Sequence, residues 1–177
     1  MTSSRDFALA AHGQQMYGDQ PYIFHLDQVA ALATQFGQTA IDVAHLHYTI
    51  EDAGIRFERL VEQFGSLTAR CVALVTDPPG ANRKERKVKL NARLALVSGE
   101  LEIALVVKIC DRLCNARNSI ERERRSLWQM NHDEHADFRV AVFRPGLCDH
   151  LWAELDEVLV DGMYERLVGS KHQVDLG

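Results

Sequence analysis

Apolar residues recur at intervals of three and four along almost the whole chain. This spacing places them on one face of an α-helix, whereas a strand half buried in a sheet alternates apolar and polar residues. Segments with such alternation are nearly absent. The pattern therefore predicts an all-α protein of about eight or nine helices.

Glycine, proline and polar residues mark the ends of the expected helices. The periodic segments cover residues 6–16, 23–36, 39–52, 57–64, 67–75, 82–97, 100–117, 132–142 and 148–168. The strongest break is Asp-Pro-Pro-Gly at 77–80, because proline lacks the backbone donor that a helix interior needs. The segment 100–117 is almost wholly apolar in its first half and is expected at the centre. With no internal repeat or linker visible, residues 1–177 are expected to form a single domain.

Composition and charge narrow the class of protein. Of the 177 residues, 46% are hydrophobic and 25% are charged, as in ordinary soluble domains. Uncharged apolar runs stay far below the roughly 20 residues of a transmembrane helix, and the N-terminus lacks the order of a signal peptide, so a cytoplasmic protein is expected. A net charge of −5 disfavours general binding to nucleic acid or to an anionic membrane. Whether the chain forms a homo-oligomer is left open.

The expected helix over residues 39–52 carries polar groups in an apolar context. His47 and Glu51 are four residues apart, as are Tyr48 and Asp52, so these four side chains are expected on one helical face. A lone histidine on such a helix is more often a core residue held by hydrogen bonds than a ligand. Two neighbouring acids shift the balance toward a chemical role.

A histidine and an aspartate, His25 and Asp111, interrupt two other apolar segments. Burying a carboxylate is costly unless a cation or strong donors meet it. One alternative for Asp111 is an ion pair with Arg112 or Arg117, or hydrogen bonds within the core. The other is a divalent metal bound jointly by His25, His47 and Asp111, because imidazole nitrogen and carboxylate oxygen suit zinc, manganese or iron. Spacing alone leaves both alternatives open.

Motifs that fit one family follow each other along residues 8–120. They are His12-Gly13-Gln14, Pro21 to His25, Leu46-His47 ahead of Glu51-Asp52, Phe64-Gly65, Val75-Thr76-Asp77, Lys84 to Lys87 and Lys108 to Asn115. In this order and spacing the chain resembles the HD-domain metal-dependent phosphohydrolases. It is most similar to the hydrolase domain of the RelA/SpoT alarmone enzymes and their small stand-alone relatives. A single histidine motif would be weak evidence, whereas the ordered set is specific.

The resemblance implies a fold, a metal and a reaction. The implied fold is all-helical, and a manganese or similar divalent ion is held by two histidines and two aspartates. His25, His47 and Asp111 match three of these four ligands. The implied reaction removes pyrophosphate from the 3′ oxygen of a guanosine nucleotide, with a water molecule that the metal acidifies.

Further positions match the catalytic and substrate-binding residues of that family. Glu51 and Asp52 match the acidic pair that orients and deprotonates the water, a task that needs a carboxylate at hydrogen-bond distance. Asn115 matches the asparagine that follows the last ligand. The resemblance also implies a basic segment that holds the phosphates, and its members here are Arg83, Lys84, Arg86 and Lys87. Each of these is equally well explained as part of a solvated helix face.

Tyr48 stands where the family has its motif aspartate, the fourth ligand. A phenol with a pKa near 10 is neutral at pH 7, so the replacement removes about one negative charge and one oxygen ligand. Three ligands with open positions can still be catalytic. Three outcomes stay open: a weakened metal site, a metal-free nucleotide pocket, or a site in which a phenolate or Asp52 partly replaces the lost ligand.

Two other stretches bear on the charge around a substrate. The family commonly carries extra basic residues after His12-Gly13-Gln14, but residues 15–18 here read Gln-Met-Tyr-Gly. Guanosine specificity is therefore less secure than phosphohydrolase chemistry. Residues 121–125 mix glutamate and arginine and are expected to form a self-compensating surface patch.

Two function hypotheses from different classes follow. The first is a metal-dependent hydrolase of a phosphorylated nucleotide, a (p)ppGpp-like guanosine alarmone, weakened by Tyr48. The alternative is a catalytically silent HD-like domain that binds a nucleotide or a partner protein. Bound metal and turnover with added manganese distinguish the two.

Overall fold

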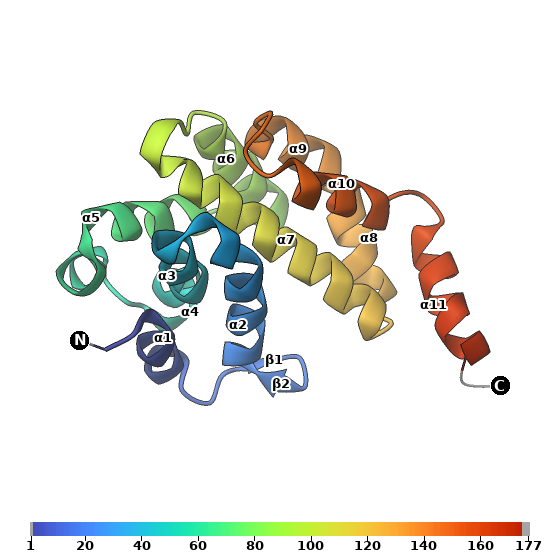
Figure 1. Ribbon diagram of the computed structural model, residues 1–177, viewed down its shortest axis with the longest axis horizontal. Coiled ribbons are helices and arrows are strands. Elements are labelled where there is room, and N and C mark those ends of the chain that lie inside the picture. The colour runs from blue at the N-terminus through green and yellow to red at the C-terminus, as the bar shows by residue number, and fades with distance from the viewer. Residues whose placement is uncertain (1, 175–177) are drawn as a thin grey trace.

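The computed structural model describes the backbone of residues 2–174 and the side chains of residues 2–170. It is almost entirely helical, which confirms the predicted all-α class (Figure 1). The α-helices are α1 (Ser4–His12), α2 (Tyr22–Ala33), α3 (Gln38–Leu46), α4 (Thr49–Ala53), α5 (Phe57–Val75), α6 (Arg83–Leu94), α7 (Ile103–Glu121), α8 (Arg125–Asp133), α9 (His135–Val142), α10 (Asp149–Val158) and α11 (Met163–Val174). Two 3-10 helices, η1 (Thr34–Phe36) and η2 (Gly99–Glu102), and two short strands, β1 (Met16–Tyr17) and β2 (Gln20–Pro21), complete the described part.

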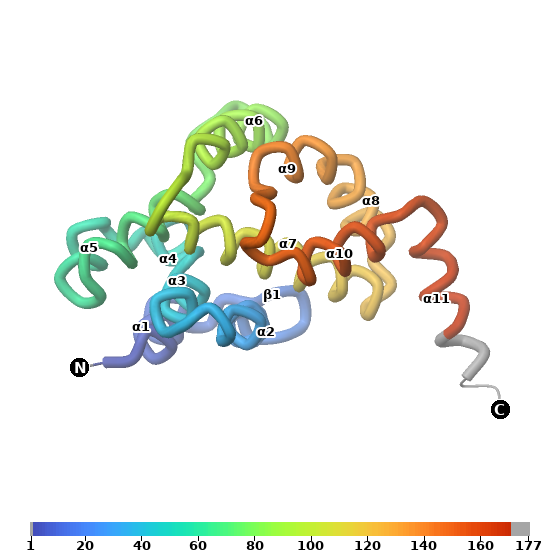
Figure 2. The backbone as a smooth tube through the Cα atoms, turned by 45° about the horizontal axis from the view of Figure 1, so that its top comes forward, coloured from blue at the N-terminus to red at the C-terminus, as the bar shows by residue number. Residues whose placement is uncertain are grey.

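Helix α7 runs through the middle of the molecule, as its apolar sequence predicts (Figures 1 and 2). Fifteen of its 19 residues are buried, so its whole circumference is covered rather than one stripe. Helices α2, α3, α5, α8 and α10 pack against it, and one contiguous hydrophobic core extends on both sides of it. Within residues 2–174, no helix combines the length and the hydrophobicity that crossing a membrane requires.

The segment 39–52 was expected to be one helix, and this prediction was wrong. Helix α3 ends at Leu46, and α4 begins at Thr49 after a turn formed by His47 and Tyr48. Tyr48 has φ −104° and ψ −2°, in the sparsely populated bridge region. The Thr49 hydroxyl donates a hydrogen bond of 2.7 Å to the Leu46 carbonyl oxygen and so occupies one of the acceptors left at the end of α3. His47 and the acidic residues of α4 therefore do not belong to one continuous α-helix.

Other boundaries differ from the predicted ones where glycine adopts positive φ. Helix α1 ends at His12 because Gly13 has φ +55°, and the next residues form a two-stranded antiparallel hairpin in which Met16 pairs with Pro21 and Tyr17 with Gln20. The expected helix 148–168 is divided into α10 and α11. The expected helix 132–142 is α9, with α8 ahead of it. Consequently the described residues hold more helices than the eight or nine predicted.

Candidate metal centre and its pocket

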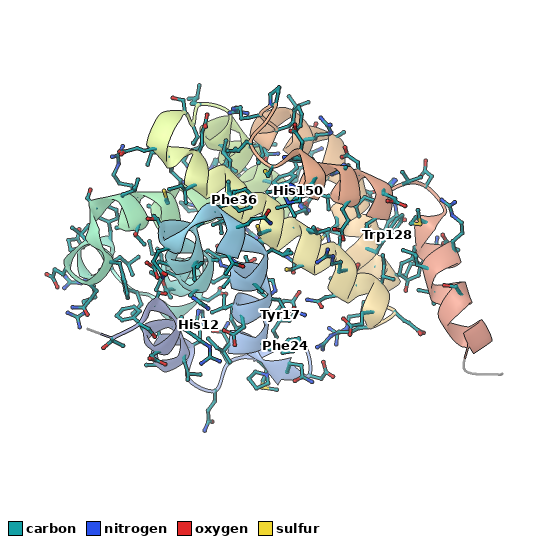
Figure 3. All side chains as sticks on the ribbon, in the orientation of Figure 1. His12, Tyr17, Phe24, Phe36, Trp128 and His150 are labelled. Carbon is teal, nitrogen blue, oxygen red and sulfur yellow. The ribbon has the colours of Figure 1, made fainter. Side chains whose placement is uncertain are left out.

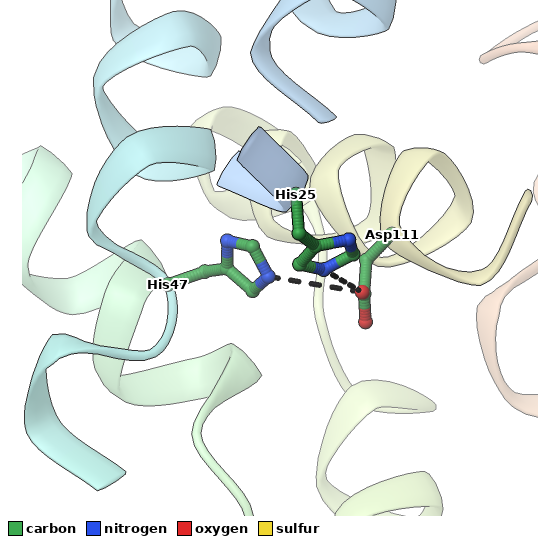
Figure 4. Close-up of side chains that lie close together, drawn as sticks. All are labelled: His25, His47 and Asp111. Carbon is green, nitrogen blue, oxygen red and sulfur yellow. Dashed lines mark hydrogen bonds and ion pairs between the residues drawn. The ribbon is translucent and has the colours of Figure 1, made fainter. Parts of the chain in front are cut away.

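His25, His47 and Asp111 meet at one point in the interior (Figure 4). His25 comes from α2, His47 from the turn between α3 and α4, and Asp111 from α7. The Oδ1 atom of Asp111 lies 3.2 Å from His25 Nε2 and 3.7 Å from His47 Nε2. One ligand atom from each of these buried residues lies within 4.8 Å of the other two. The structure thus brings together the three residues that the resemblance implies as metal ligands.

The protonation of His47 leaves a lone pair facing Asp111. His47 Nδ1 lies 2.5 Å from the carbonyl oxygen of Ala44, so Nδ1 carries the proton and donates it there. Burial lowers the pKa of His47 and favours the neutral ring. Its buried Nε2 has no hydrogen-bond partner among the described residues. Two acceptors, this nitrogen and a carboxylate oxygen, thus face each other, and a divalent cation between them fits both.

Asp111 is held as a carboxylate by its surroundings. Burial opposes its ionisation, but the Lys108 ammonium and the hydrogen bond with His25 outweigh burial and hold the Asp111 pKa well below its usual value. Lys108 Nζ lies 3.4 Å from Oδ2. The side-chain amide of Asn115 donates a hydrogen bond of 2.8 Å to Oδ1. The anionic ligand is therefore fixed in orientation from two sides.

The ion pairs considered for Asp111 from the sequence are not formed. Arg112 pairs with Glu134 at 3.0 Å, and Arg117 pairs with Glu154. Both arginines thus have acidic partners other than Asp111. The cation beside Asp111 is Lys108, one helical turn earlier.

Two tyrosine rings cover the histidines on the pocket side. The Tyr48 ring centroid lies 4.2 Å from that of His47, and its hydroxyl lies 3.5 Å from Asp111 Oδ1. Tyr17, labelled in Figure 3, stacks on His25 at 4.4 Å with an interplanar angle of 13°. Burial raises the pKa of Tyr48 well above its usual value, so the phenol stays neutral. Tyr48 thus occupies the place of the family's fourth ligand without supplying its charge.

Glu51 and Asp52, the expected water-handling pair, lie outside the three-residue cluster. The Tyr22 hydroxyl donates a 2.7 Å hydrogen bond to Asp52 Oδ2, and the backbone N–H of Asp77 donates one of 3.1 Å to Glu51 Oε2. Both side chains are exposed, yet desolvation by nearby protein raises the pKa of Glu51. The charge of Lys108, which lies beside Asp111, acts on Glu51 and opposes this rise.

A pocket opens beside the cluster, and the empty space within it and at its mouth, open solvent included, is about 1000 Å³. Tyr17, Tyr48, Asp111 and Asn115 line it near the cluster. Its lining includes six cationic side chains and, among the described residues, one acidic side chain, Asp111. The cationic residues are Arg83, Lys87, Lys108, Arg112, Arg122 and Arg124. In a chain of net charge −5, this concentration of positive charge suits a polyanionic ligand.

Only part of the predicted basic segment faces the pocket. Arg83 and Lys87 line it, whereas Lys84 is exposed outside it and Arg86 approaches Asp77 at 3.7 Å. The reason is helix geometry, because residues 83 and 87 are one turn apart on α6 and residues 84 and 86 lie on other faces. That all four residues hold phosphate stays a prediction, and only Arg83 and Lys87 of the four line this pocket.

Four of the cationic lining residues were not predicted to bind substrate. Lys108 and Arg112 flank Asp111 on α7, and Arg122 and Arg124 follow the end of that helix. Arg122 pairs with Asp19 of the β1–β2 turn, so residues 121–125 are more than a surface patch. A helical period counted from Asp111 would have found Lys108 and Arg122, since they lie at i−3 and i+11.

Comparisons with known proteins agree with this architecture. No protein-family model matches the chain. The chain is 35% identical over 125 residues to human guanosine-3′,5′-bis(diphosphate) 3′-pyrophosphohydrolase MESH1, covering 67% of this chain and 68% of the human protein. It is 33% identical over 120 residues to zebrafish MESH1, covering 64% of this chain and 65% of that protein. An Aquifex aeolicus enzyme named guanosine-3′,5′-bis(diphosphate) 3′-pyrophosphohydrolase is 31% identical over 115 residues, covering 63% of this chain and 16% of its own length. The chain thus spans less than two thirds of the last two relatives.

Solved structures show the same fold. A metazoan ortholog of SpoT, described as hydrolysing ppGpp, superposes with a TM-score of 0.71 at 22% identity, covering 90% of this chain and 94% of that one. A crystal structure from Listeria monocytogenes gives a TM-score of 0.62 at 17% identity, covering 82% of this chain and 99% of that one. These likenesses establish the all-α fold. Together with the similarity to human MESH1, they show that the chain belongs to the family of HD-type guanosine-3′,5′-bis(diphosphate) 3′-pyrophosphohydrolases.

Proposed function

We propose that this chain is a metal-dependent hydrolase that removes the 3′-pyrophosphate of a (p)ppGpp-like guanosine nucleotide. The observation that carries the proposal is the His25–His47–Asp111 cluster at the wall of a pocket with six cationic side chains and one acid. The names of the curated relatives give the same reaction for those proteins. A catalytically silent binding domain needs the cationic pocket but has no use for the buried cluster.

The metal proposed for this site is a divalent ion, manganese as in the family that the sequence resembles. His25, His47 and Asp111 would hold it, because His47 presents a free lone pair and Asp111 is kept anionic. When bound, such an ion acidifies a water molecule and polarises a phosphoryl oxygen. With Tyr48 neutral, the three protein ligands supply one negative charge where the family supplies two, so we propose a weakened site.

The residues of the chain itself have separate tasks in this proposal. Lys108 and Arg112, one on each side of Asp111 along α7, would hold the 3′-pyrophosphate under attack, and Asn115 would fix the Asp111 carboxylate. Glu51 and Asp52 would orient the water and accept its proton, a role for which the raised pKa of Glu51 is favourable. In the reaction, water oxygen bonds to the phosphorus, the bond from that phosphorus to the 3′ oxygen breaks, and the 3′ oxygen takes up a proton.

The test is hydrolysis of ppGpp by the purified full chain with manganese, followed by chromatography of GDP and pyrophosphate. Asp111→Asn should abolish turnover and lower the manganese content, because it removes the anionic ligand. Glu165→Gln is a matched control, since Glu165 pairs with Arg125 at the surface, and it should leave both unchanged. Absence of turnover with manganese, magnesium or zinc, together with retained ppGpp binding, would establish the silent binding domain instead.

A further inference from the structure

The pocket extends along one stripe of α7, which leads away from the candidate metal centre. Five lining residues follow each other along this stripe at intervals of about one turn. They are Lys108, Asp111, Asn115, Ser119 and, just past the helix end, Arg122. At 1.5 Å per residue, the eleven positions from Asp111 to Arg122 correspond to about 16 Å. The pocket therefore has a metal end and a distant end.

Positive charge is found at both ends, and neutral groups lie between them. Arg83, Lys87 and Arg112 each have an acidic partner, Glu134 for the two arginines and Asp77 for the lysine. Along α7 between Arg112 and Arg122, the lining side chains are neutral and polar, and they are Asn115, Asn118 and Ser119. A ligand that fits this pocket thus has anionic groups on two arms and a less charged centre.

The distant end is built by the β1–β2 turn and the residues that follow α7. A Cβ atom added at Gly18 would lie 3.0 Å from Arg124 Nη2 and 3.4 Å from Arg122 Nη1, so both guanidinium groups lie directly against the Gly18 backbone. Arg122 is held there by its ion pair with Asp19, whose own side chain is 69% exposed. Glycine at position 18 is what lets the two arginines approach the turn.

We propose that Arg122 and Arg124, packed on Gly18, bind the 5′-phosphate groups of the nucleotide and so select substrates phosphorylated on both arms of the ribose. This inference rests on the proposed function, because it takes the 3′-pyrophosphate to lie at the metal end. Two guanidinium groups offer paired N–H donors that suit phosphate oxygens. They also bring positive charge to the backbone of residues 15–18, which carry no basic side chain themselves.

Asp19 fixes the orientation of Arg122 in this distal site before substrate binds. Its ion pair keeps the partly buried Arg122 side chain, 18% exposed, oriented toward the turn. A 5′-diphosphate carries more negative charge than one carboxylate, so it can replace Asp19 as the partner of Arg122. The exposed Asp19 side chain then returns to water at little cost.

The test compares binding of two nucleotides to metal-free, chelator-treated protein by calorimetry. One is ppGpp, and the other is guanosine 3′-diphosphate with a free 5′-hydroxyl. Arg122→Gln and Arg124→Gln should each weaken ppGpp binding by about tenfold, the loss expected for a charge-assisted hydrogen bond. Binding of the 5′-hydroxyl compound should change less than twofold. Equal weakening for both nucleotides, or no weakening for either, would overturn the inference.

Two controls separate a specific site from general charge and from backbone strain. Arg125→Gln removes the neighbouring arginine, which pairs with Glu165 outside the pocket, and should leave the preference for ppGpp intact. Gly18→Ala should reduce the preference for ppGpp, because the new methyl group meets Arg124. Gly13 also has positive φ, but a Cβ atom there meets no atom within 4 Å. Gly13→Ala should therefore leave the preference for ppGpp unchanged. If Arg125→Gln lowers ppGpp binding as much as Arg124→Gln does, the distal site is refuted.

These binding measurements do not depend on turnover. A chain that fails to hydrolyse ppGpp but shows the predicted loss in Arg122→Gln and Arg124→Gln would refute the proposed reaction and retain the distal phosphate site. A chain that hydrolyses ppGpp and the 5′-hydroxyl compound equally well, in every variant, would retain the reaction and refute the distal site.

Discussion

Tyr48 changes the balance of charge in a site that is otherwise complete. Its ring packs against His47, and its hydroxyl approaches Asp111 at 3.5 Å. With a neutral phenol there, Asp111 alone opposes the charge of a divalent ion, and Lys108 competes for that carboxylate at 3.4 Å. For the proposed metal site, we therefore expect weaker binding of a cation than in a site with two carboxylates.

Replacing Tyr48 by aspartate should strengthen the metal site. The substitution adds a carboxylate within reach of the cluster and removes the ring that covers His47. We expect manganese content and ppGpp hydrolysis to rise together, each by about tenfold or more, as for outer partners of metal ligands whose loss costs 10–100-fold. Elemental analysis and a pyrophosphate-release assay measure the two quantities on the same preparation.

Tyr48→Phe is the matched control for that variant. It keeps the ring and removes only the hydroxyl, so no ligand is gained and manganese content should stay at the wild-type level. If Tyr48→Asp behaves like Tyr48→Phe in both assays, position 48 is not the place of the fourth ligand.

The meeting of His25, His47 and Asp111 could be predicted from the sequence. Each is a polar group in an apolar segment, where burial is costly without a partner, and the family resemblance joined the three into one set, which the structure brings together. The roles of Glu51 and Asp52 stay predictions, and the structure places both outside the three-residue cluster. The expected single helix was wrong, and i, i+4 spacing implies a shared face only in an unbroken helix.

At the scale of elements, glycine conformation decides where several helices bend or end. In α5, Gly65 has φ +84° and ψ +164°, a region that is almost exclusively accessible to glycine. The predicted break at Gly65 is confirmed as this kink. Boundaries without such a signal, such as the start of α8, were missed because propensity alone does not reveal them.

Gly65→Ala and Gly169→Ala should change stability in opposite directions. An added Cβ meets no atom within 4 Å at either position, so steric contact is equal and only the backbone differs. Gly65→Ala should lower the free energy of unfolding by about 1–3 kcal/mol through strain. Gly169→Ala, inside α11, should raise helix stability by at most about 1 kcal/mol. Urea unfolding followed by circular dichroism measures both, and a Gly65→Ala variant as stable as wild type would contradict the strained kink.

At the scale of the whole molecule, Glu134 ties three helical regions together beside the pocket. It accepts hydrogen bonds from Arg83 at the start of α6 and from Arg112 on α7, while it lies between α8 and α9 itself. Burial raises its pKa, but the hydrogen bond from Arg83 and the charge of Arg112 outweigh burial and lower it overall. Two guanidinium groups share one carboxylate, so the pocket keeps a net positive charge even where its arginines are paired.

This ion-pair triad should make stability depend on pH in a definite direction. Because the folded-state pKa of Glu134 is depressed, its contribution is fully present above the unfolded-state value of about 4.3 and is lost as pH falls through the folded-state pKa. Glu134→Gln should therefore cost roughly 1–3 kcal/mol at pH 7, because two arginines lose their anionic partner, and the difference from wild type should shrink below about pH 4. Thermal unfolding of both proteins from pH 3 to pH 8 measures this.

Glu165→Gln, which removes an exposed ion pair, is the control and should lower the free energy of unfolding by no more than about 0.5 kcal/mol. If the loss of unfolding free energy in Glu134→Gln stays constant with pH, packing rather than the charge of Glu134 joins α6 to α7.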